Sequence, residues 1–247
     1  MPDLLDLAGK HILITGASSG IGRSCAVQAS RLGAKVTCTA RNVDGLQETV
    51  SMMACPEIHN IVTFDMSETE KIEAMVKNVV QDFGMLDGLC HAAGFGSPKP
   101  LRMTKPEFVE SLFRVNTFSF LALLHCCARK ETMNPGGSIV GISSVAAEQG
   151  NIYQGTYAAS KAAMNGVLYP AARELASRKI RVNNVAFSMV DTISYTKFQT
   201  FGDESKLREK QLLGIIDVES AANSVMFLLS DACPYITGAV LPVYAGF

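Results

Sequence analysis

The chain has 247 residues, of which 48% are hydrophobic, and a formal net charge of -1. This length and composition suffice for one large buried core, so we expect a single domain over residues 1–247. The balanced charge provides no basic field for nucleic acid, and no apolar run reaches the length of a membrane span. The acidic start lacks a signal-peptide pattern, which favours a cytoplasmic protein.

Seven cysteines are scattered along the chain, and only Cys126 and Cys127 are close together, within an apolar helix pattern. An odd number of dispersed cysteines predicts reduced, buried thiols. None of the four histidines has metal-ligand spacing to another histidine or to a cysteine. We therefore expect no metal site.

Short apolar runs alternate with amphipathic stretches, which is typical of repeated strand–helix–strand units. The sequence therefore predicts an α/β, doubly wound fold with a seven-stranded parallel sheet flanked by helices. The strands are expected at residues 11–15, 35–40, 60–64, 86–91, 137–143, 180–186 and 239–243.

The first expected strand leads into a glycine-rich turn that spells Thr-Gly-Ala-Ser-Ser-Gly-Ile-Gly over residues 15–22, and a helical pattern follows. Glycines at 16, 20 and 22 let the backbone pass close to a pyrophosphate, whose charge suits the free N–H groups of a helix N-terminus. The spacing differs from the commoner dinucleotide fingerprint. A Rossmann-type domain that binds a dinucleotide is the resulting expectation.

Ala40 and Arg41 follow the second expected strand. An acidic residue at this place binds the ribose 2′-hydroxyl of NAD, whereas an arginine beside a small residue accommodates the 2′-phosphate of NADP. The pair therefore predicts NADP(H) in preference to NAD(H). The alternative is a surface arginine with no ligand.

Two helical segments are informative. Ser67 and Glu70 predict a capping box, followed by an apolar stripe that ends at Gly84. The segment Lys105–Arg129 is apolar almost all round the helix, so it must be covered both by the sheet and by something else.

Tyr157 and Lys161 are four residues apart in a helical pattern, and Ser144 ends a strand thirteen residues before Tyr157. Four-residue spacing places the phenol and the ammonium on one helix face. At about 5 Å this charge would lower the pKa of a tyrosine from about 10 toward 8, which makes the phenol a usable acid. The alternative is a packed ring beside a solvated amine.

The glycine turn and the Tyr157–Lys161 pair, in this order, resemble the short-chain dehydrogenase/reductase family. The resemblance extends from Lys10 to the Tyr-Ile-Thr-Gly segment at 235–238, and the overall pattern is most similar to 3-oxoacyl-thioester reductases. It implies hydride transfer between NADPH and a carbonyl, with a homodimer or homotetramer that covers the apolar segment Lys105–Arg129.

The resemblance also implies roles for catalytic residues. Ser144 would hold the carbonyl, Tyr157 would give its proton to the alkoxide, and Lys161 would acidify Tyr157 and bind the nicotinamide ribose. Asn116 would hold a water that passes protons to the lysine; the alternative is an amide that caps a local helix distortion. Ser143 is expected to face the other side of the strand.

The same resemblance implies a set of cofactor contacts. Asp65 would hold the adenine edge, although an aspartate before a helix is also an ordinary cap. The complete expected set is Gly16, Ser18, Ser19, Gly20, Ile21, Gly22, Arg41, Asp65, Met66, His91, Ala92, Gly94, Tyr157, Lys161, Ser188, Val190 and Thr192.

Several positions depart from the family pattern. His91 stands where the family usually has asparagine, so we expect its neutral imidazole to supply part of the hydrogen bonding between strands. Phe187 and Ser188 replace a usual Pro-Gly beside the nicotinamide. Pro170 lies inside the helix that begins near Tyr157 and predicts a kink.

The substrate is the least determined feature. Residues 189–213 are expected to form a flap over the pocket. Three hypotheses remain open: a reductase of an acyl thioester or similar small oxo compound, the same chemistry on a sugar, polyol, steroid-like or secondary-metabolite substrate, and a nucleotide-binding subunit without turnover. An acyl carrier protein is a further candidate partner, and the exposed basic residues Arg129, Lys130, Arg173 and Arg178 would bind it.

Overall fold

The computed structural model describes residues 5–192 and 211–247. It contains a seven-stranded sheet, parallel throughout, in the order β3-β2-β1-β4-β5-β6-β7. The strands are β1 (His11–Thr15), β2 (Lys35–Ala40), β3 (Asn60–Thr63), β4 (Leu86–His91), β5 (Met133–Ser144), β6 (Arg181–Phe187) and β7 (Val240–Val243). This arrangement confirms the expected α/β Rossmann-type sheet.

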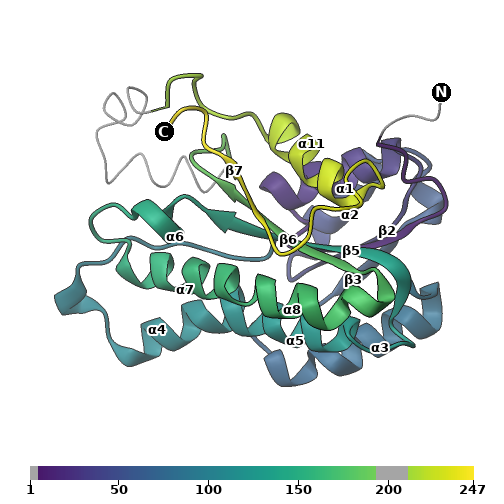
Figure 1. Cartoon of the computed structure of the whole chain (residues 1–247), viewed down its shortest axis with the longest axis horizontal. Helices are drawn as coiled ribbons and strands as arrows, with labels where there is room; N and C mark the ends of the chain where they lie inside the picture. The colour runs from purple at the N-terminus through teal and green to yellow at the C-terminus, as the bar shows by residue number, and fades with distance from the viewer. Residues whose placement is uncertain (1–4, 193–210) are drawn as a thin grey trace.

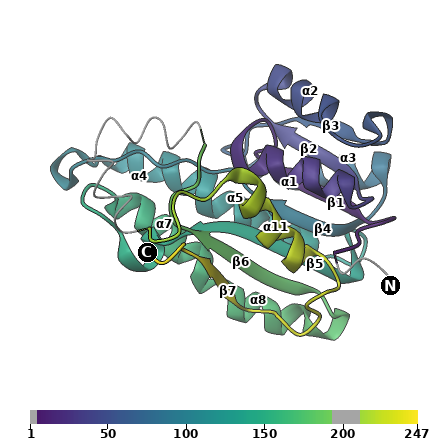
Figure 2. The ribbon, with the colours of Figure 1, turned by 90° about the horizontal axis from the view of Figure 1, so that it is seen from above.

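Helices cover both faces of the sheet (Figures 1 and 2). One face carries α1 (Gly20–Arg31), α2 (Val43–Ser51) and α11 (Val218–Leu229). The other carries α3 (Ile72–Phe83), α4 (Pro106–Phe113), α5 (Ser119–Cys127), α7 (Gly155–Gly166) and α8 (Leu168–Leu175), and the short α6 (Ala146–Gln149) follows β5. Each face has its own apolar cluster, since a sheet buried on both sides needs two cores.

The strand order reverses between β1 and β4, so the connections run in opposite directions on the two sides of this point. Ligands of doubly wound sheets bind outside the carboxyl ends of the strands at such a switch point. The ends of β1 and β4 are Thr15 and His91, which are partners in the strand register.

The expected strand boundaries agree closely with the structure, with one larger difference. β1, β2 and β4 have the expected bounds, whereas β5 begins at Met133 and not at 137. Met133 pairs with Leu86, and the register then shifts before Ser138 pairs with Gly88. The sequence Asn-Pro-Gly-Gly between the two pairs is typical of a turn, so it does not predict a strand that begins before it.

The expected capping box before α3 is wrong. A 3₁₀ turn, η2 (Thr69–Lys71), precedes the helix, and the backbone N–H of Ser67 donates to Asp65 Oδ1 at 2.8 Å. The carboxylate of Glu70 accepts from Arg114 at 2.9 Å. Arg114, which is distant in sequence, therefore binds the Glu70 carboxylate that was expected to cap the helix.

The apolar segment over 105–129 is not one regular helix. A π-helix, η4 (Arg114–Phe118), separates α4 from α5. Phe118 and Leu121 remain exposed in this chain, by 44% and 42%, as expected of a face that needs a further cover. The predicted kink at Pro170 is confirmed, because the helix is interrupted at Val167 between α7 and α8.

Three further short turns complete the described elements: η1 (Pro56–Ile58), η3 (Leu101–Met103) and η5 (Ala176–Arg178). Six of the seven cysteines are buried as predicted, but Cys55 is exposed. None of the helices described is long and apolar enough to cross a bilayer.

Replacing Gly141 in β5 with alanine tests how tightly the sheet packs against α5 and α7. An added Cβ would meet Asn184 Oδ1 and lie 3.2 Å from both Phe120 Cζ and Met164 Cε. We expect Gly141→Ala to lower the free energy of unfolding by about 1–3 kcal/mol, because overpacking forces neighbours apart. Urea denaturation measures the change.

Gly166→Ala is the matched control, since nothing lies within 4 Å of an added Cβ at this helical position. It should be neutral or raise the free energy of unfolding by up to about 1 kcal/mol. Equal stability of the two variants would contradict the packing argument.

Candidate active site

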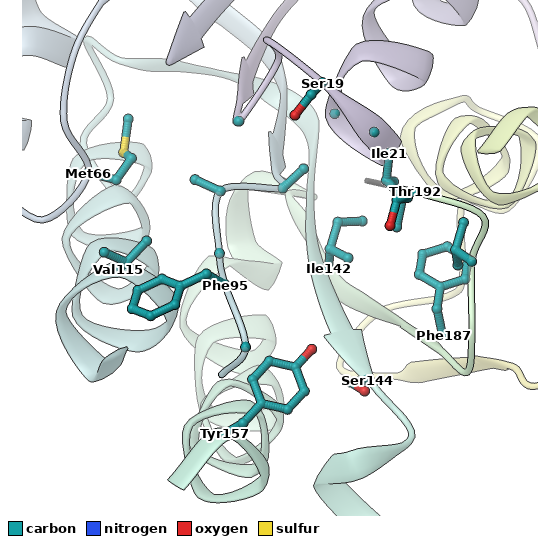
Figure 3. Close-up of a pocket in the computed structure, with 18 of the residues that line it drawn as sticks. Ser19, Ile21, Met66, Phe95, Val115, Ile142, Ser144, Tyr157, Phe187 and Thr192 are labelled. Atoms are coloured by element: carbon teal, nitrogen blue, oxygen red, sulfur yellow. The ribbon is translucent and has the colours of Figure 1, made fainter. Parts of the chain in front are cut away.

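A cavity of about 790 Å³ lies at the carboxyl ends of the strands. Its walls come from the β1–α1 turn, the ends of β2 to β6, and α7 (Figure 3). It contains every expected catalytic and cofactor residue except Asn116 and His91.

The glycine turn forms one end of this cavity. Gly16 and Gly20 have positive φ values of 68° and 54°, and a Cβ on Gly16 would lie 2.7 Å from the backbone nitrogen of Ala93. A Cβ on Gly22 would collide with the carbonyl oxygen of Gly16. Because α1 begins at Gly20, the partial positive charge of its N-terminus faces the cavity, as a pyrophosphate requires.

Arg41 and Asp65 approach each other beside this turn. Arg41 Nη1 lies 3.5 Å from Asp65 Oδ2, and the Arg41 side chain is 75% exposed. Partial burial raises the pKa of Asp65, but hydrogen bonds from Ser67 and the charge of Arg41 outweigh it and hold this pKa below its usual range. Asp65 thus caps the local turn and also lines the cavity, so both interpretations of this residue fit the structure.

Ser144 and Tyr157 meet at the other end of the cavity. Ser144 is the last residue of β5, and the Tyr157 hydroxyl extends from α7 into the space beside it (Figure 3). Burial raises the pKa of Tyr157, although its hydrogen bond with Ser144 acts in the opposite direction. A phenol next to a hydroxyl can hold a carbonyl oxygen and give it a proton.

Lys161 is buried on α7, one turn after Tyr157. Its Nζ donates to the carbonyl of Ile142 at 2.7 Å and lies 6.0 Å from the centre of the Tyr157 ring. Burial lowers the pKa of Lys161 to about 8. The expected lowering of the Tyr157 pKa is therefore wrong for this structure, because desolvation of the phenol outweighs its hydrogen bond with Ser144.

Asn116 lies in the π-helix, fully buried. Its Oδ1 accepts from Phe95 N at 2.9 Å, and its Nδ2 donates to Phe95 O and to Ser160 Oγ, each at 3.0 Å. These partners come from other parts of the chain, so the amide is not a local cap. It joins the segment after β4 to the helix that carries Tyr157, while its expected role in a water relay stays a prediction.

His91 does not line the cavity, so its expected place among the cofactor contacts is wrong. The side chain is fully buried, stacks on Phe120 with ring centroids 5.5 Å apart, and bonds to Thr15 and Ser119. The ring lies beneath the strand ends, where the sheet and α5 enclose it. The expectation that it supplies hydrogen bonds between strands is confirmed.

The chain after β6 forms the wall opposite α7. Phe187 is 3% exposed and lines the cavity, and Ser188 Oγ donates to the carbonyl of Tyr244 at 2.9 Å. The Gln211 amide accepts from Met189 N at 3.2 Å and donates to Met189 O at 2.9 Å. Of the expected flap, residues 193–210 lie outside the described part of the chain.

Sequence reasoning missed several residues of the cavity wall. Most are neighbours of expected residues, and a strand-end position was the signal that could have found them. Ser143 was expected to face away, yet it also lines the cavity, and its buried Oγ has no hydrogen-bond partner among the described residues. The missed set is Asn42, Phe64, Ala93, Phe95, Gly96, Ser97, Pro98, Val115, Ile142, Ser143 and Gln154.

Comparison with known proteins agrees with this geometry. Residues 16–247 match a family model described as enoyl-(acyl carrier protein) reductase. The 7alpha-hydroxysteroid dehydrogenase of Escherichia coli (strain K12) is 32% identical over 251 residues, covering 99% of this chain and 96% of the relative. A 3-oxoacyl-(acyl-carrier-protein) reductase of Pseudomonas aeruginosa is 32% identical over 243 residues, covering 98% of each.

Solved structures show the same fold. A dehydrogenase/reductase from Sinorhizobium meliloti 1021 superposes with a TM-score of 0.88 at 30% identity, over 98% of this chain and 96% of the other. A 3-ketoacyl-(acyl-carrier-protein) reductase from Brucella melitensis complexed with NADH gives 0.87 at 27% identity, over 98% and 99%. The chain therefore belongs to the short-chain dehydrogenase/reductase family. It is an oxidoreductase that acts on alcohol or carbonyl groups with a nicotinamide cofactor.

The burial of Lys161 predicts a pH-dependent stability. Its pKa is about 8 in the folded protein and 10.5 in the ordinary state, so the unfolded chain binds more protons between these pH values. The free energy of unfolding therefore rises with pH across this window, and the cost of the buried charge is complete below pH 8. We expect Lys161→Met to be more stable than the parent below pH 8, with a difference that shrinks toward pH 10.5.

Thermal unfolding of both proteins without nucleotide, between pH 6 and 10.5, measures this difference. Lys130→Met is the control, because Lys130 is exposed and its replacement should give no such trend. A difference between the Lys161 variant and the parent that stays constant with pH would contradict the argument.

Proposed function

We propose that this protein is an NADP-dependent reductase that transfers hydride from NADPH to the carbonyl of a 3-oxoacyl thioester or a similar small oxo compound. The observation that carries the proposal is the pairing of Tyr157 with Ser144 in the cavity whose other end holds the glycine turn and Arg41. The glycine turn fits a nucleotide, since no side chain could occupy Gly16 or Gly22.

The cofactor, when bound, supplies the hydride. Ser144 and Tyr157 hold the carbonyl oxygen between their hydroxyls, and Tyr157 gives its proton to the alkoxide as negative charge develops there. Lys161 keeps its own proton below a pH of about 8, and its charge stabilises the phenolate that remains. Arg41, exposed beside Asp65, would meet the 2′-phosphate.

The cavity wall near Tyr157 favours a small substrate with apolar parts. Phe95, Pro98, Ile142 and Phe187 contribute aromatic and aliphatic surface, while Ser144 and Tyr157 supply the hydroxyls that would orient a carbonyl. Such a lining orients a carbonyl and leaves the rest of the molecule in apolar contact.

A carrier protein is less well supported as the form in which the substrate arrives. Arg129 pairs with Glu73 at 2.6 Å, and Arg178 donates to the carbonyl of Ala128 at 3.0 Å near the end of α5. Arg173 stacks on Tyr169. Three of the four candidate basic residues thus have structural partners, so a free or coenzyme-linked thioester is the form we propose.

The second candidate function is the same chemistry on a sugar, polyol, steroid-like or secondary-metabolite substrate. The similarity to a 7alpha-hydroxysteroid dehydrogenase favours a steroid-like alcohol within this group. A nucleotide-binding subunit without turnover is disfavoured, because Ser144, Tyr157 and Lys161 are brought together in one cavity.

We also propose a homodimer or homotetramer in the cytoplasm. Phe118 and Leu121 on the η4–α5 segment and Tyr169 on α8 are exposed by 44%, 42% and 64% on the helical face that carries α5 and α8. Large exposed apolar side chains of this kind mark association surfaces.

A spectrophotometric screen of NADPH oxidation tests the proposal, with acetoacetyl thioesters, diketones, keto sugars and oxosteroids as substrates. Reduction of acetoacetyl thioesters supports the first function, and reduction of keto sugars or oxosteroids alone supports the second. NADPH binding without oxidation by any of these compounds would refute both.

Tyr157→Phe should abolish turnover, by about 100-fold or more, because it removes the proton donor and keeps the ring. NADPH affinity should stay within about threefold of the parent, since the phenol oxygen contributes little to holding the nucleotide. Comparable rates in the variant and the parent would remove Tyr157 from its assigned role.

Arg41 should give a preference for NADPH over NADH of about tenfold or more in affinity, as a charge-assisted phosphate contact requires. Arg41→Ala should remove most of this preference by weakening NADPH binding alone. Arg31→Ala is the control, because Arg31 pairs with Glu219 outside the cavity. Equal affinities of the parent for both nucleotides, measured by fluorescence titration, would refute the assignment.

A further inference from the structure

His91 is a buried histidine with a hydrogen bond on each ring nitrogen. Nδ1 lies 2.9 Å from Thr15 Oγ1, and Nε2 lies 3.2 Å from Ser119 Oγ. The ring is inaccessible to solvent and packs on Phe120. It therefore connects the last residue of β1 with the first residue of α5, 104 positions later in the chain.

The neighbouring hydrogen bonds determine the tautomer of this ring. Ser119 donates its hydroxyl proton to Val115 O at 2.6 Å, so its oxygen accepts from His91 Nε2–H. Thr15 Oγ1 accepts from Ala93 N–H at 3.1 Å, which leaves its own proton for His91 Nδ1. The result is one directed chain of donors, from Ala93 through Thr15, His91 and Ser119 to Val115.

The charge state agrees with this chain. Burial lowers the pKa of His91 to about 3, and the positive charge of Lys161 acts in the same direction. The imidazole is therefore neutral, and its single proton has one position that satisfies all the partners.

One end of the chain reaches the nucleotide side of the cavity. Thr15 precedes Gly16, and the backbone of Gly16 lies against Ala93 so closely that a Cβ would be 2.7 Å from Ala93 N. Thr15 Oγ1 holds that same nitrogen. A loss of this bond would loosen the contact between the glycine turn and the segment after β4, although Thr39 and Thr49 also bond to the turn at Ala17.

The other end reaches the catalytic side. Ser119 holds the carbonyl of Val115 within the π-helix, and the next residue is Asn116. Asn116 binds Phe95 and Ser160, and Ser160 Oγ donates to the carbonyl of Tyr157 at 2.7 Å. The position of the proton donor is thereby linked to the π-helix.

We propose that His91 is a positioning residue that, in one neutral tautomer, couples the nucleotide-binding turn at Thr15–Gly16 to the π-helix that carries Asn116. The proposal rests on the proposed function for its kinetic consequence but not for its structural one. The two hydroxyl partners separate its two effects: Thr15 acts on nucleotide binding, and Ser119 acts on turnover.

Four variants test the coupling. Thr15→Val should raise the Kd of NADPH by threefold or more and speed exchange of the Ala93 amide. Ser119→Ala should leave this Kd within twofold, speed exchange of the Phe95 amide and lower kcat by threefold or more. His91→Phe keeps an aromatic ring and should show both patterns, whereas His91→Asn reaches Thr15 alone and should resemble Ser119→Ala.

Thr37→Val is the matched control. Thr37 is also a buried threonine bonded to a histidine, with its Oγ1 2.8 Å from His11 Nε2, and His11 begins β1 at the end away from the cavity. This variant should change thermal stability but neither the NADPH Kd nor kcat.

NADPH titration and amide exchange by NMR need no substrate, so they remain decisive if the parent reduces none of the screened compounds. In that case the proposed function fails and the coupling is still tested. ¹⁵N shifts of the His91 ring should show protonated Nε2 and unprotonated Nδ1 from pH 5 to 8. The proposal is overturned if Thr15→Val and Ser119→Ala behave like Thr37→Val, or if the ring titrates in this range.

Discussion

The candidate site depends on one buried amide, the side chain of Asn116. It binds both backbone groups of Phe95 and the hydroxyl of Ser160, and so ties the segment after β4 to α7. A π-helix carries this side chain, and such insertions into a regular helix are frequent at functional sites. These bonds connect the cavity wall formed by residues 92–98 directly to the helix that carries Tyr157.

Burial acts on the pKa values of Tyr157 and Lys161 in opposite directions. It raises the pKa of Tyr157 and lowers that of Lys161, because the charged form of each group loses solvation. The phenol is therefore protonated near neutral pH, as its proposed role as a proton donor requires. Lys161 keeps a positive charge below about pH 8 and lies 6.0 Å from the centre of the Tyr157 ring, where its proposed role is to stabilise a phenolate.

The departures from the family pattern are compensated by polar contacts elsewhere. The imidazole of His91 replaces an asparagine beneath the strand ends and makes bonds toward both β1 and α5. Ser188, in place of a glycine, binds the carbonyl of Tyr244, and Gln211 binds both backbone groups of Met189. The chain beside the expected nicotinamide position is thus held by side-chain bonds at a place where the family usually has a Pro-Gly pair.

Much of the site was predictable from residues close together in the sequence. Apolar runs specified the strands, the three glycines specified the nucleotide turn, and four-residue spacing placed Tyr157 and Lys161 on one helix face. Contacts between distant segments decided the rest. Arg114 takes Glu70 away from a capping box, the π-helix directs Asn116 toward Phe95, and the enclosed position of His91 removes it from the cavity. The sequence by itself determined the strands, the glycine turn and the candidate catalytic residues, because periodicity and turn chemistry are local. The tertiary structure alone decided the burial, partners and protonation of these residues, because desolvation and hydrogen bonding depend on every element packed around them.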